Sequence, residues 1–314
     1  MSSAVLISAD WGTTALRLYL LAGDGRILDK RASTQGMTSV AKGGFADVMR
    51  DNCATWLSDH GPLPALLSGM VGSRQGWIEA PYVSCPAGLA ELASHTARLD
   101  VPGFKAVEIV AGVDTVDPLG LPDVMRGEEC QIMGALAQMG LRDGMFVLPG
   151  THSKWVTLAD GRISGFRTFM TGEIFAALKD HTILGRMMAP HMSAEANAES
   201  EAFTRGVEIA VKSVGPGEWL HRLFSVRTLG LMGRLADTDA ADYLSGLMIG
   251  WEMASLPARP AGPLVLVGSR ELSRRYRRAA ELRALVTVEA PEDCVCAGHL
   301  AIARAGGLFE RGAS

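Results

Sequence analysis

The sequence predicts an α/β fold in two lobes, and three observations support this prediction. A pattern of strand, loop, strand, turn and strand occupies residues 5–28, and it recurs over residues 145–166. Runs with helical spacing follow each pattern, which is typical of α/β proteins. The 314 residues are 48% hydrophobic, so the chain can fill two cores of ordinary size. We expect one lobe of residues 1–143 and a second lobe of residues 144–314.

In the first lobe, β-prone runs at residues 5–8, 16–21 and 26–28 predict three strands. The tripeptide of Gly23, Asp24 and Gly25 is a turn signal between the last two runs. Apolar residues at turn spacing then predict helices over two stretches, which are residues 46–57 and 128–139. A glycine-rich stretch at residues 68–76 lies between these helices.

In the second lobe, the pattern predicts strands and then helices. Strands are expected at residues 145–148, 155–158 and 162–166, with a loop at 149–154. A further buried strand, residues 263–267, runs into Gly268 and Ser269. Helical spacing predicts helices over residues 200–214, 218–231, 240–256, 271–285 and 294–305.

Charge and cysteine content exclude several classes of protein. The net charge of −4 argues against a nucleic-acid binder that works through bulk charge. No apolar run reaches the ~18 residues of a membrane helix, and Asp10 interrupts the first apolar run too early for a signal peptide. The five scattered cysteines indicate reduced thiols rather than a disulfide framework. We therefore expect a cytoplasmic protein that acts on a small molecule.

The first loop carries residues that suit a bound phosphate. A strand–loop–strand turn with Gly12, Thr13 and Thr14 can point several backbone N–H groups and two hydroxyls at an anion. Asp10 stands where the first strand ends, and a carboxylate there can hold Mg²⁺ against phosphates. An ordinary hairpin with an acidic turn residue remains the alternative.

The second loop repeats this chemistry. Gly150 allows close approach, Thr151 and Ser153 carry hydroxyls, and Lys154 carries a positive charge for phosphate. His152 lies between them and has no assigned role beyond this loop. Two such loops could grip one triphosphate from both sides, although a single lysine is often a plain surface residue.

These two loops, followed by a strand that ends in Gly268 and Ser269, resemble the actin–hexokinase–chaperone ATPase superfamily. That resemblance implies two lobes with a ribonuclease H-like fold, each a mixed five-stranded sheet flanked by helices, and ATP with Mg²⁺ in the cleft. It also implies that the third segment holds the adenosine. Gly268 and Ser269 replace a glycine pair of many members, so the contacts to the base stay open.

Six further motifs carry a closer resemblance, and they are residues 10–14 with Arg17, 69–73 with 76–77 and 80–82, 124–129 with Gln131, 149–152 with 154–156, 166–168 with 170–173, and 244–247 with 249–250. They resemble the 2-dehydro-3-deoxygalactonokinase family, and the resemblance extends nearly end to end. It implies transfer of the γ-phosphoryl group of ATP to the 6-hydroxyl of 2-dehydro-3-deoxy-D-galactonate. It also adds Arg17 to the ATP-binding residues already named.

The catalytic base should be a carboxylate at a helix start, where related sugar kinases often carry an aspartate. Glu128 is the preferred candidate because it follows Gly127 at such a start, with Asp123 and Glu129 as rivals. Acidic residues in a first helical turn also simply complement the helix dipole. The sequence leaves both roles open for these residues.

The sugar-acid carboxylate calls for an arginine or for backbone amides. Arg74 is the preferred candidate, and Arg126 and Arg167 are alternatives. The glycine-rich stretch supplies the other expected substrate contacts, and Tyr82 could form a further wall. These contacts are Gly69, Met70, Ser73, Gln75 and Trp77.

Three rival functions stay open. The first is a kinase of another sugar acid, such as 2-keto-3-deoxygluconate. The second is a phosphohydrolase of the same superfamily, and the third is a non-enzymatic ATP-gated binder. The oligomeric state, a homodimer included, is also open. The arginines of residues 270–278 are expected to form a solvated helix with ion pairs rather than a nucleic-acid patch.

Overall fold

The structure is a computed structural model, and it describes residues 3–188, 198–213, 215, 217–256, 260 and 262–310. The chain forms two compact units. Unit 1 comprises Met1–Asp143, Thr157–Phe166 and Pro291–Ser314, and unit 2 comprises Gly144–Val156 and Arg167–Ala290. The expected second lobe of residues 144–314 differs from unit 2 at two segments, because 157–166 and 291–314 belong to unit 1.

The main sheet of unit 1 has the strand order β3-β2-β1-β4-β7-β6. Strand β2 runs antiparallel to β1 and β3, whereas β4 is parallel to both β1 and β7. Strand β6 adds an antiparallel sixth member, so the prediction of five strands was wrong by one. The strands are β1 (Ala4–Trp11), β2 (Leu16–Ala22), β3 (Ile27–Ser33), β4 (Pro64–Ser68), β6 (Ala97–Leu99) and β7 (Ala106–Ile109).

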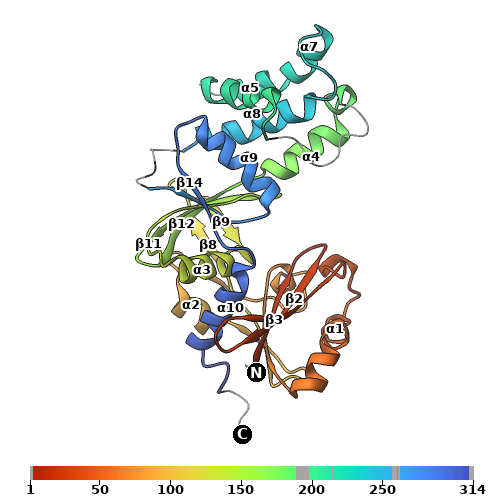
Figure 1. Ribbon diagram of the computed structural model, residues 1–314, viewed down its shortest axis with the longest axis vertical. Helices are drawn as coiled ribbons and strands as arrows, with labels where there is room; N and C mark the ends of the chain where they lie inside the picture. Colours follow the sequence, from red (N-terminus) through yellow and green to blue (C-terminus); the bar gives the residue numbers. More distant parts are fainter. Residues whose placement is uncertain are drawn as a thin grey trace. The chain divides into compact units, whose positions relative to one another are not determined.

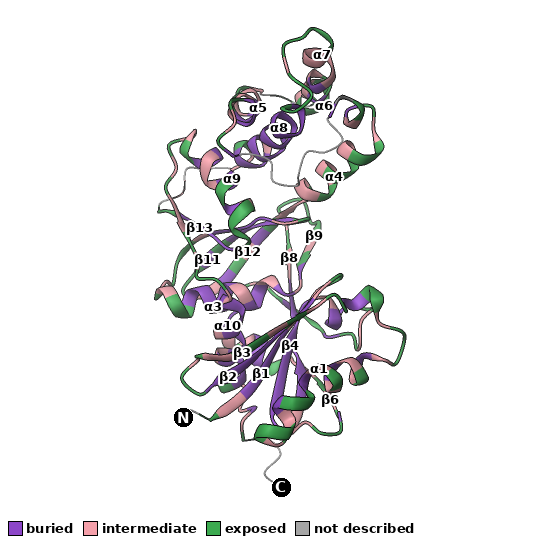
Figure 2. Cartoon of the chain, turned by 45° about the vertical axis from the view of Figure 1, so that its right-hand side comes forward, coloured by how far each residue is buried: buried purple, intermediate pink, exposed green. Residues whose placement is uncertain are grey.

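Helices cover both faces of this sheet because successive side chains of a strand point to opposite faces. Ile7 of β1 packs in the core that Met49 and Trp56 of α1 (Phe45–His60) complete. Ser8 points the other way, and its Oγ lies 2.7 Å from Nδ1 of the buried His299 on α10 (Cys294–Ala305). Figure 1 shows α1 and α10 on opposite sides of the sheet, and Figure 2 shows β1 and β4 buried.

Helix α10 crosses α3 (Glu128–Met139) at unusually close range. A Cβ on Gly134 would lie 1.7 Å from the carbonyl oxygen of Cys294, and a Cβ on Gly298 would lie 1.9 Å from that of Cys130. Both contacts are with backbone atoms, so only glycine permits this crossing. The backbones of the two helices thus pack directly against each other.

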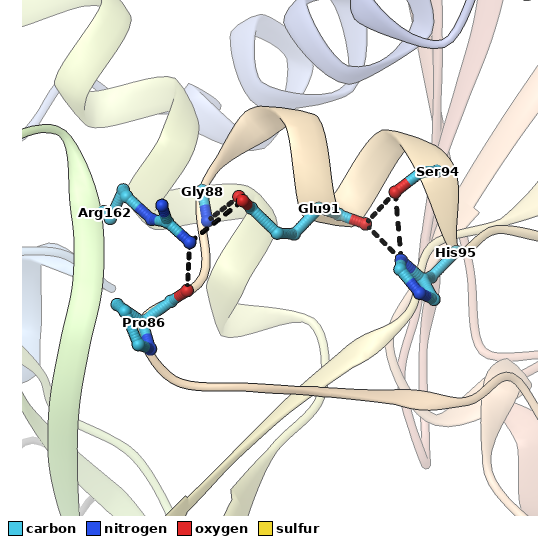
Figure 3. Close-up of polar contacts among 6 residues, drawn as sticks. All are labelled: Pro86, Gly88, Glu91, Ser94, His95 and Arg162. Carbon is cyan, nitrogen blue, oxygen red and sulfur yellow. Dashed lines mark hydrogen bonds and ion pairs between the residues drawn. The ribbon is translucent and has the colours of Figure 1, made fainter.

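Unit 1 also contains a three-stranded sheet of order β5-β8-β9, and the segment 157–166 joins unit 1 beside helix α2. Arg162 donates to Glu91 Oε1 at 2.9 Å and to the carbonyl of Pro86 at 2.5 Å, as Figure 3 shows. Ile163 forms a backbone bridge with Ala87. The elements are β5 (Tyr82–Ser84), α2 (Leu89–Ser94), β8 (Gly112–Val116) and β9 (Pro122–Met125), with short 3₁₀ turns η1 (Met37–Ser39) and η2 (Met70–Gly72) elsewhere in unit 1.

The second large sheet repeats the order of the first, as β12-β11-β10-β13-β14. Strands β10, β13 and β14 are parallel, matching β1, β4 and β7. The predicted recurrence is therefore confirmed, as is the α/β class of mixed sheets flanked by helices expected for an actin-like ATPase fold. The strands are β10 (Gly144–Leu148), β11 (Ser153–Ala159), β12 (Arg162–Phe169), β13 (Leu264–Leu266) and β14 (Thr287–Glu289).

The helices of unit 2 pack around α8, which is buried along most of its length (Figure 2). The predicted helix over 218–231 is two helices, because Phe224 separates α6 from α7. The hydroxyl oxygens of Ser200 and Ser269 cap α5 and α9, as such residues commonly do. Val214, at the predicted end of α5, lies outside the described residues. The helices are α4 (Thr171–His181), η3 (Gly185–Met187), α5 (Glu201–Lys212), α6 (Glu218–Leu223), α7 (Ser225–Leu231), α8 (Ala240–Ala254) and α9 (Arg270–Glu281).

All five cysteines are free, in agreement with the expected reduced thiols. In the described parts of the chain, no helix combines the length and the apolar character needed to cross a membrane.

Replacing Gly298 by alanine should destabilise unit 1. The added methyl would meet the Cys130 carbonyl and push α10 away from α3, which we expect to cost about 3 kcal/mol. Urea denaturation monitored by circular dichroism would measure the loss. Gly262→Ala is the control, since a Cβ there meets nothing within 4 Å. Equal midpoints for the two variants would contradict the close crossing.

Candidate active site

Loop one, residues 12–15, joins β1 to β2 and leaves backbone N–H groups exposed to solvent. The Gly12 N–H donates to the carbonyl of Ala15 at 2.9 Å, which closes the turn. The carbonyls of Gly12 and Thr13 accept from the N–H groups of Met37 and Thr38, and these hydrogen bonds fix the loop to η1. In the described part of the chain, the N–H groups of Thr13 and Thr14 donate to no protein group. These exposed donors are what a phosphate loop requires.

Gly36 is a residue of this site that the sequence reasoning missed. A Cβ there would lie 2.2 Å from the carbonyl carbon of Thr14, so only glycine lets the segment before η1 lie against loop one. A single glycine between a strand and a helix is common, so no local signal distinguishes Gly36.

Three chain segments meet where β1 ends. Asp10 lies beside Ser68 in the parallel pairing of β1 with β4. The next residue, Gly69, has φ of 90°, and a Cβ on it would lie 2.9 Å from the carbonyl of Trp11 and 3.5 Å from Asp10 Oδ1. A Cβ on Gly127 would in turn lie 3.1 Å from the Gly69 Cα. The amino end of α3 is thereby brought to the carboxyl ends of β1 and β4.

The Asp10 carboxylate is half-buried, and Arg17 is its cationic neighbour in the described part of the chain. Arg17 stands opposite it in the pairing of β1 with β2, and its Nη1 lies 3.3 Å from Asp10 Oδ2. Burial raises the pKa of Asp10, and Arg17 opposes that shift. Arg17 is largely exposed, with 59% of its side chain accessible.

Glu128 and Glu129 begin α3, as predicted, but they lie in different surroundings. Glu128 is half-buried, and its Oε2 accepts from the Arg126 N–H at 3.0 Å. Glu129 is fully buried, and both its oxygens accept from the Gly127 N–H, at 2.9 and 2.7 Å. Burial, with help from Glu128, raises the pKa of Glu129 to about 8. Asp123 is in strand β9 rather than at a helix start.

The two arginine candidates of unit 1 also differ. The Arg74 side chain is 80% exposed and lies 3.4 Å from Glu79 Oε1. Arg126 donates from Nη2 to the Ala80 carbonyl at 2.8 Å and stacks over the Tyr82 ring at 4.3 Å. Its Nε and Nη1 are buried and have no partner in the described residues. Arg74 is therefore open to a ligand, whereas Arg126 supports the chain around it.

The other expected substrate contacts divide between surface and core. Gln75 is exposed, whereas Ser73 is buried and its Oγ lies 3.6 Å from the sulfur of Met37. Trp77 packs against the rings of Trp11 and Phe45, so its main role is in the core, where Met70 also packs.

Loop two, in unit 2, is shorter than predicted. Strand β11 starts at Ser153, so the loop is 149–152, and Ser153 and Lys154 are buried strand residues. Lys154 Nζ donates to Thr168 Oγ1 at 2.8 Å and has no carboxylate within 4 Å in the described part of the chain. Thr151 and His152 are exposed, and His152 pairs with Glu173 of α4.

Gly268 and Ser269 lie beside loop two within unit 2. A Cβ on Gly268 would lie 3.5 Å from the Pro149 carbonyl. Ser269 Oγ caps α9 by accepting from the Leu272 N–H at 3.4 Å. Arg167, the remaining arginine candidate, donates to the Ser255 carbonyl. The predicted ion pairs of the arginine-rich helix are present for Arg275, Arg277 and Arg278, but Arg275 is buried rather than solvated.

The residues of unit 1 fit a magnesium ion held mainly by phosphate oxygens. Within the described residues, no group of three or more His, Cys, Asp or Glu side chains is arranged to hold a metal. Mg²⁺ usually takes one or two carboxylates and completes its shell with water and substrate phosphates. Asp10 offers one such carboxylate, and its Oδ1 has no protein donor in the part of the chain described.

The buried Glu129 should make stability depend on pH. Because its folded pKa of about 8 lies above the ordinary 4.5, the folded state keeps a proton that the unfolded state releases. The free energy of unfolding should therefore fall by up to about 1.4 kcal/mol per pH unit as pH rises from 5 to 8. Glu129→Gln, which cannot titrate, should lack this slope. The free energy of unfolding would be measured by urea denaturation at several pH values. An equal fall with rising pH in wild type and variant would contradict the assignment.

Comparison with known proteins identifies the family. Residues 10–302 match the family described as 2-keto-3-deoxy-galactonokinase. A probable 2-dehydro-3-deoxygalactonokinase of Rhizobium meliloti (strain 1021) is 42% identical over 95% of this chain and 96% of its own. The 2-dehydro-3-deoxygalactonokinase of Escherichia coli (strain K12) is 33% identical over 96% of this chain and 99% of its own. A crystal structure of a candidate 2-dehydro-3-deoxygalactonokinase from Sinorhizobium meliloti superposes with a TM-score of 0.86, at 40% identity, and covers 96% of this chain and 98% of that one. The chain therefore belongs to the 2-keto-3-deoxy-galactonokinase family.

Proposed function

We propose that this protein phosphorylates 2-dehydro-3-deoxy-D-galactonate at its 6-hydroxyl, with ATP as the donor. The observation that carries the proposal is family membership over residues 10–302, with relatives that align nearly end to end. The meeting of Asp10, Gly69 and the start of α3 supports it, because a metal-binding carboxylate and a base are both needed for phosphoryl transfer.

We further propose that loop one and loop two are each a phosphate-binding loop. The N–H groups of the exposed residues Thr13 and Thr14 support this role for loop one. For loop two the support is Lys154, whose charge has no carboxylate within 4 Å among the described residues. Asp10 would hold Mg²⁺, which neutralises the charge on the phosphates. Gly268 and Ser269 would lie near the adenosine.

Glu128 is the proposed base. It takes the proton of the 6-hydroxyl as that oxygen attacks the γ-phosphorus and the bond to the bridging oxygen of ADP breaks. Glu129 is unsuited, because its carboxyl is buried and fixed on the Gly127 N–H. Asp123 accepts from the adjacent Val124 N–H within strand β9, which ties one of its oxygens.

Kinetics with two epimers would test the function. ADP release, measured by a coupled assay, should depend on 2-dehydro-3-deoxygalactonate and should be much slower with the gluconate epimer. Equal rates for both epimers would point to a broader sugar-acid kinase. ADP or phosphate release without any acceptor would instead support a phosphohydrolase.

Glu128→Gln should lower kcat by about 10²- to 10⁴-fold while MgATP affinity stays within twofold, because a general base acts only in the chemical step. Calorimetry with MgATP and steady-state kinetics would separate the two effects. Glu201→Gln is a matched control, since Glu201 also opens a helix and complements its dipole. Near-normal turnover of the Glu128 variant would reject the assignment.

Arg74→Ala should raise KM for the sugar acid by about tenfold or more and leave KM for ATP nearly unchanged. The lost interaction is a charged hydrogen bond to the substrate carboxylate. Arg98→Ala is the control, because Arg98 is 66% exposed and forms an ion pair of the same 3.4 Å length with Glu108. If both KM values change equally and slightly, Arg74 is not in the site, and Arg126→Ala becomes the next variant to measure.

A further inference from the structure

One buried carboxylate in unit 2 accepts hydrogen bonds from side chains of three other elements. Glu252 of α8 is 2% exposed. Its Oε1 accepts from the indole N–H of Trp155 at 2.6 Å, and its Oε2 accepts from the Tyr276 hydroxyl at 2.8 Å and from the Thr171 hydroxyl. These donors come from β11, α9 and α4, so a single side chain connects four elements of the unit.

The network has a defined direction, because each hydroxyl has one proton to give. Tyr276 donates to Glu252, so the Ser153 hydroxyl, 2.7 Å from the Tyr276 oxygen, donates to Tyr276. Ser153 is the first residue of β11 and directly follows loop two. The hydrogen-bond network therefore extends from Glu252 to the residue that directly follows loop two.

The same network reaches loop two from its other side. Thr171 is the first residue of α4, and a Cβ on the following Gly172 would lie 2.5 Å from the Gly150 carbonyl. The Glu173 N–H also donates to the Thr151 carbonyl at 3.0 Å. Any shift of the first turn of α4 would therefore move loop two.

A small cavity lies among these elements. It has a volume of about 50 Å³, and its lining includes Gly150, Thr171, Gly172 and Tyr276, together with Ser245 and the buried Arg275. Two of these residues, Thr171 and Tyr276, are direct partners of Glu252. The walls of the cavity beside loop two are thus set by the hydrogen bonds of one carboxylate.

We infer that Glu252 is a positioning residue for nucleotide binding, which acts by fixing loop two and the first turn of α4 through Thr171, Tyr276 and Ser153. The inference rests on the proposed function, because it takes loop two to be a nucleotide-binding loop. Burial raises the pKa of Glu252, and the hydrogen bonds from Thr171, Trp155 and Tyr276 oppose that shift. The donors therefore stabilise the buried carboxylate, and the carboxylate in turn fixes the positions of the three donor side chains.

Tyr276→Phe tests the inference with little change in packing. The variant keeps the ring and removes only the hydroxyl that joins Ser153 to Glu252. Tyr243→Phe is the matched control: Tyr243 is equally buried in unit 2, and its hydroxyl lies 2.7 Å from Ser225 Oγ, away from Glu252. Both variants would be measured by calorimetry with MgATP, by steady-state kinetics and by thermal denaturation. Glu252→Gln would be measured in the same way.

The expected result is a MgATP Kd five- to tenfold higher for Tyr276→Phe, a change below twofold for Tyr243→Phe, and a sugar-acid KM that is unchanged in both. Glu252→Gln should change Kd in the same direction as Tyr276→Phe. If wild type binds MgATP and the two tyrosine variants bind it equally well, the positioning role is wrong although the proposed function stands. If wild type binds no MgATP, the proposed function fails and this inference fails with it.

Discussion

The candidate site of unit 1 depends on the close approach of Gly69 to Gly127. Both positions favour glycine, because their φ angles are +90° and +108°. A Cβ on Gly69 would also lie 2.9 Å from the Trp11 carbonyl, and a Cβ on Gly127 would lie 3.1 Å from the Gly69 Cα. Glu129 fixes the approach by accepting from the Gly127 N–H with both carboxyl oxygens. The amino end of α3, and Glu128 with it, is held at the end of β1 for this reason. Glu129, a buried acid that stays largely protonated near neutral pH, thus holds Gly127 in place, while the half-buried Glu128 beside it is the proposed base.

The same logic recurs in unit 2 with different residues. Gly172 allows α4 to approach loop two, and Glu252 holds the surrounding elements by hydrogen bonds from Thr171, Trp155 and Tyr276. In each unit a glycine supplies the close approach and a buried glutamate fixes it. Such an arrangement places loop atoms on a rigid support, which is what a site for phosphoryl transfer needs.

Much of the fold could be predicted from the sequence, because strands, turns and helices leave local signals. The turn at residues 23–25, the helix over 128–139 and the recurrence of the first pattern at 145–166 were all readable from residue types and spacing. The burial of individual carboxylates was harder to predict. Glu128 and Glu129 are identical in type and adjacent, and only the packing of α3 decides that one is buried and the other half-exposed. Gly36, Glu252 and the burial of Lys154 depend on contacts between residues distant in sequence, for which a single sequence carries no signal.

The placement of α10 in unit 1 has a consequence for how the chain is made. A ribosome releases residues 1–143 of unit 1 first. Unit 2 follows, together with the 157–166 segment of unit 1, and α10 emerges only afterwards. Until α10 emerges, Ser8 of β1 has no His299 to contact, and Gly134 of α3 has no Cys294 carbonyl to pack against. The inserted unit can therefore complete its fold during synthesis, while the unit that begins first finishes last.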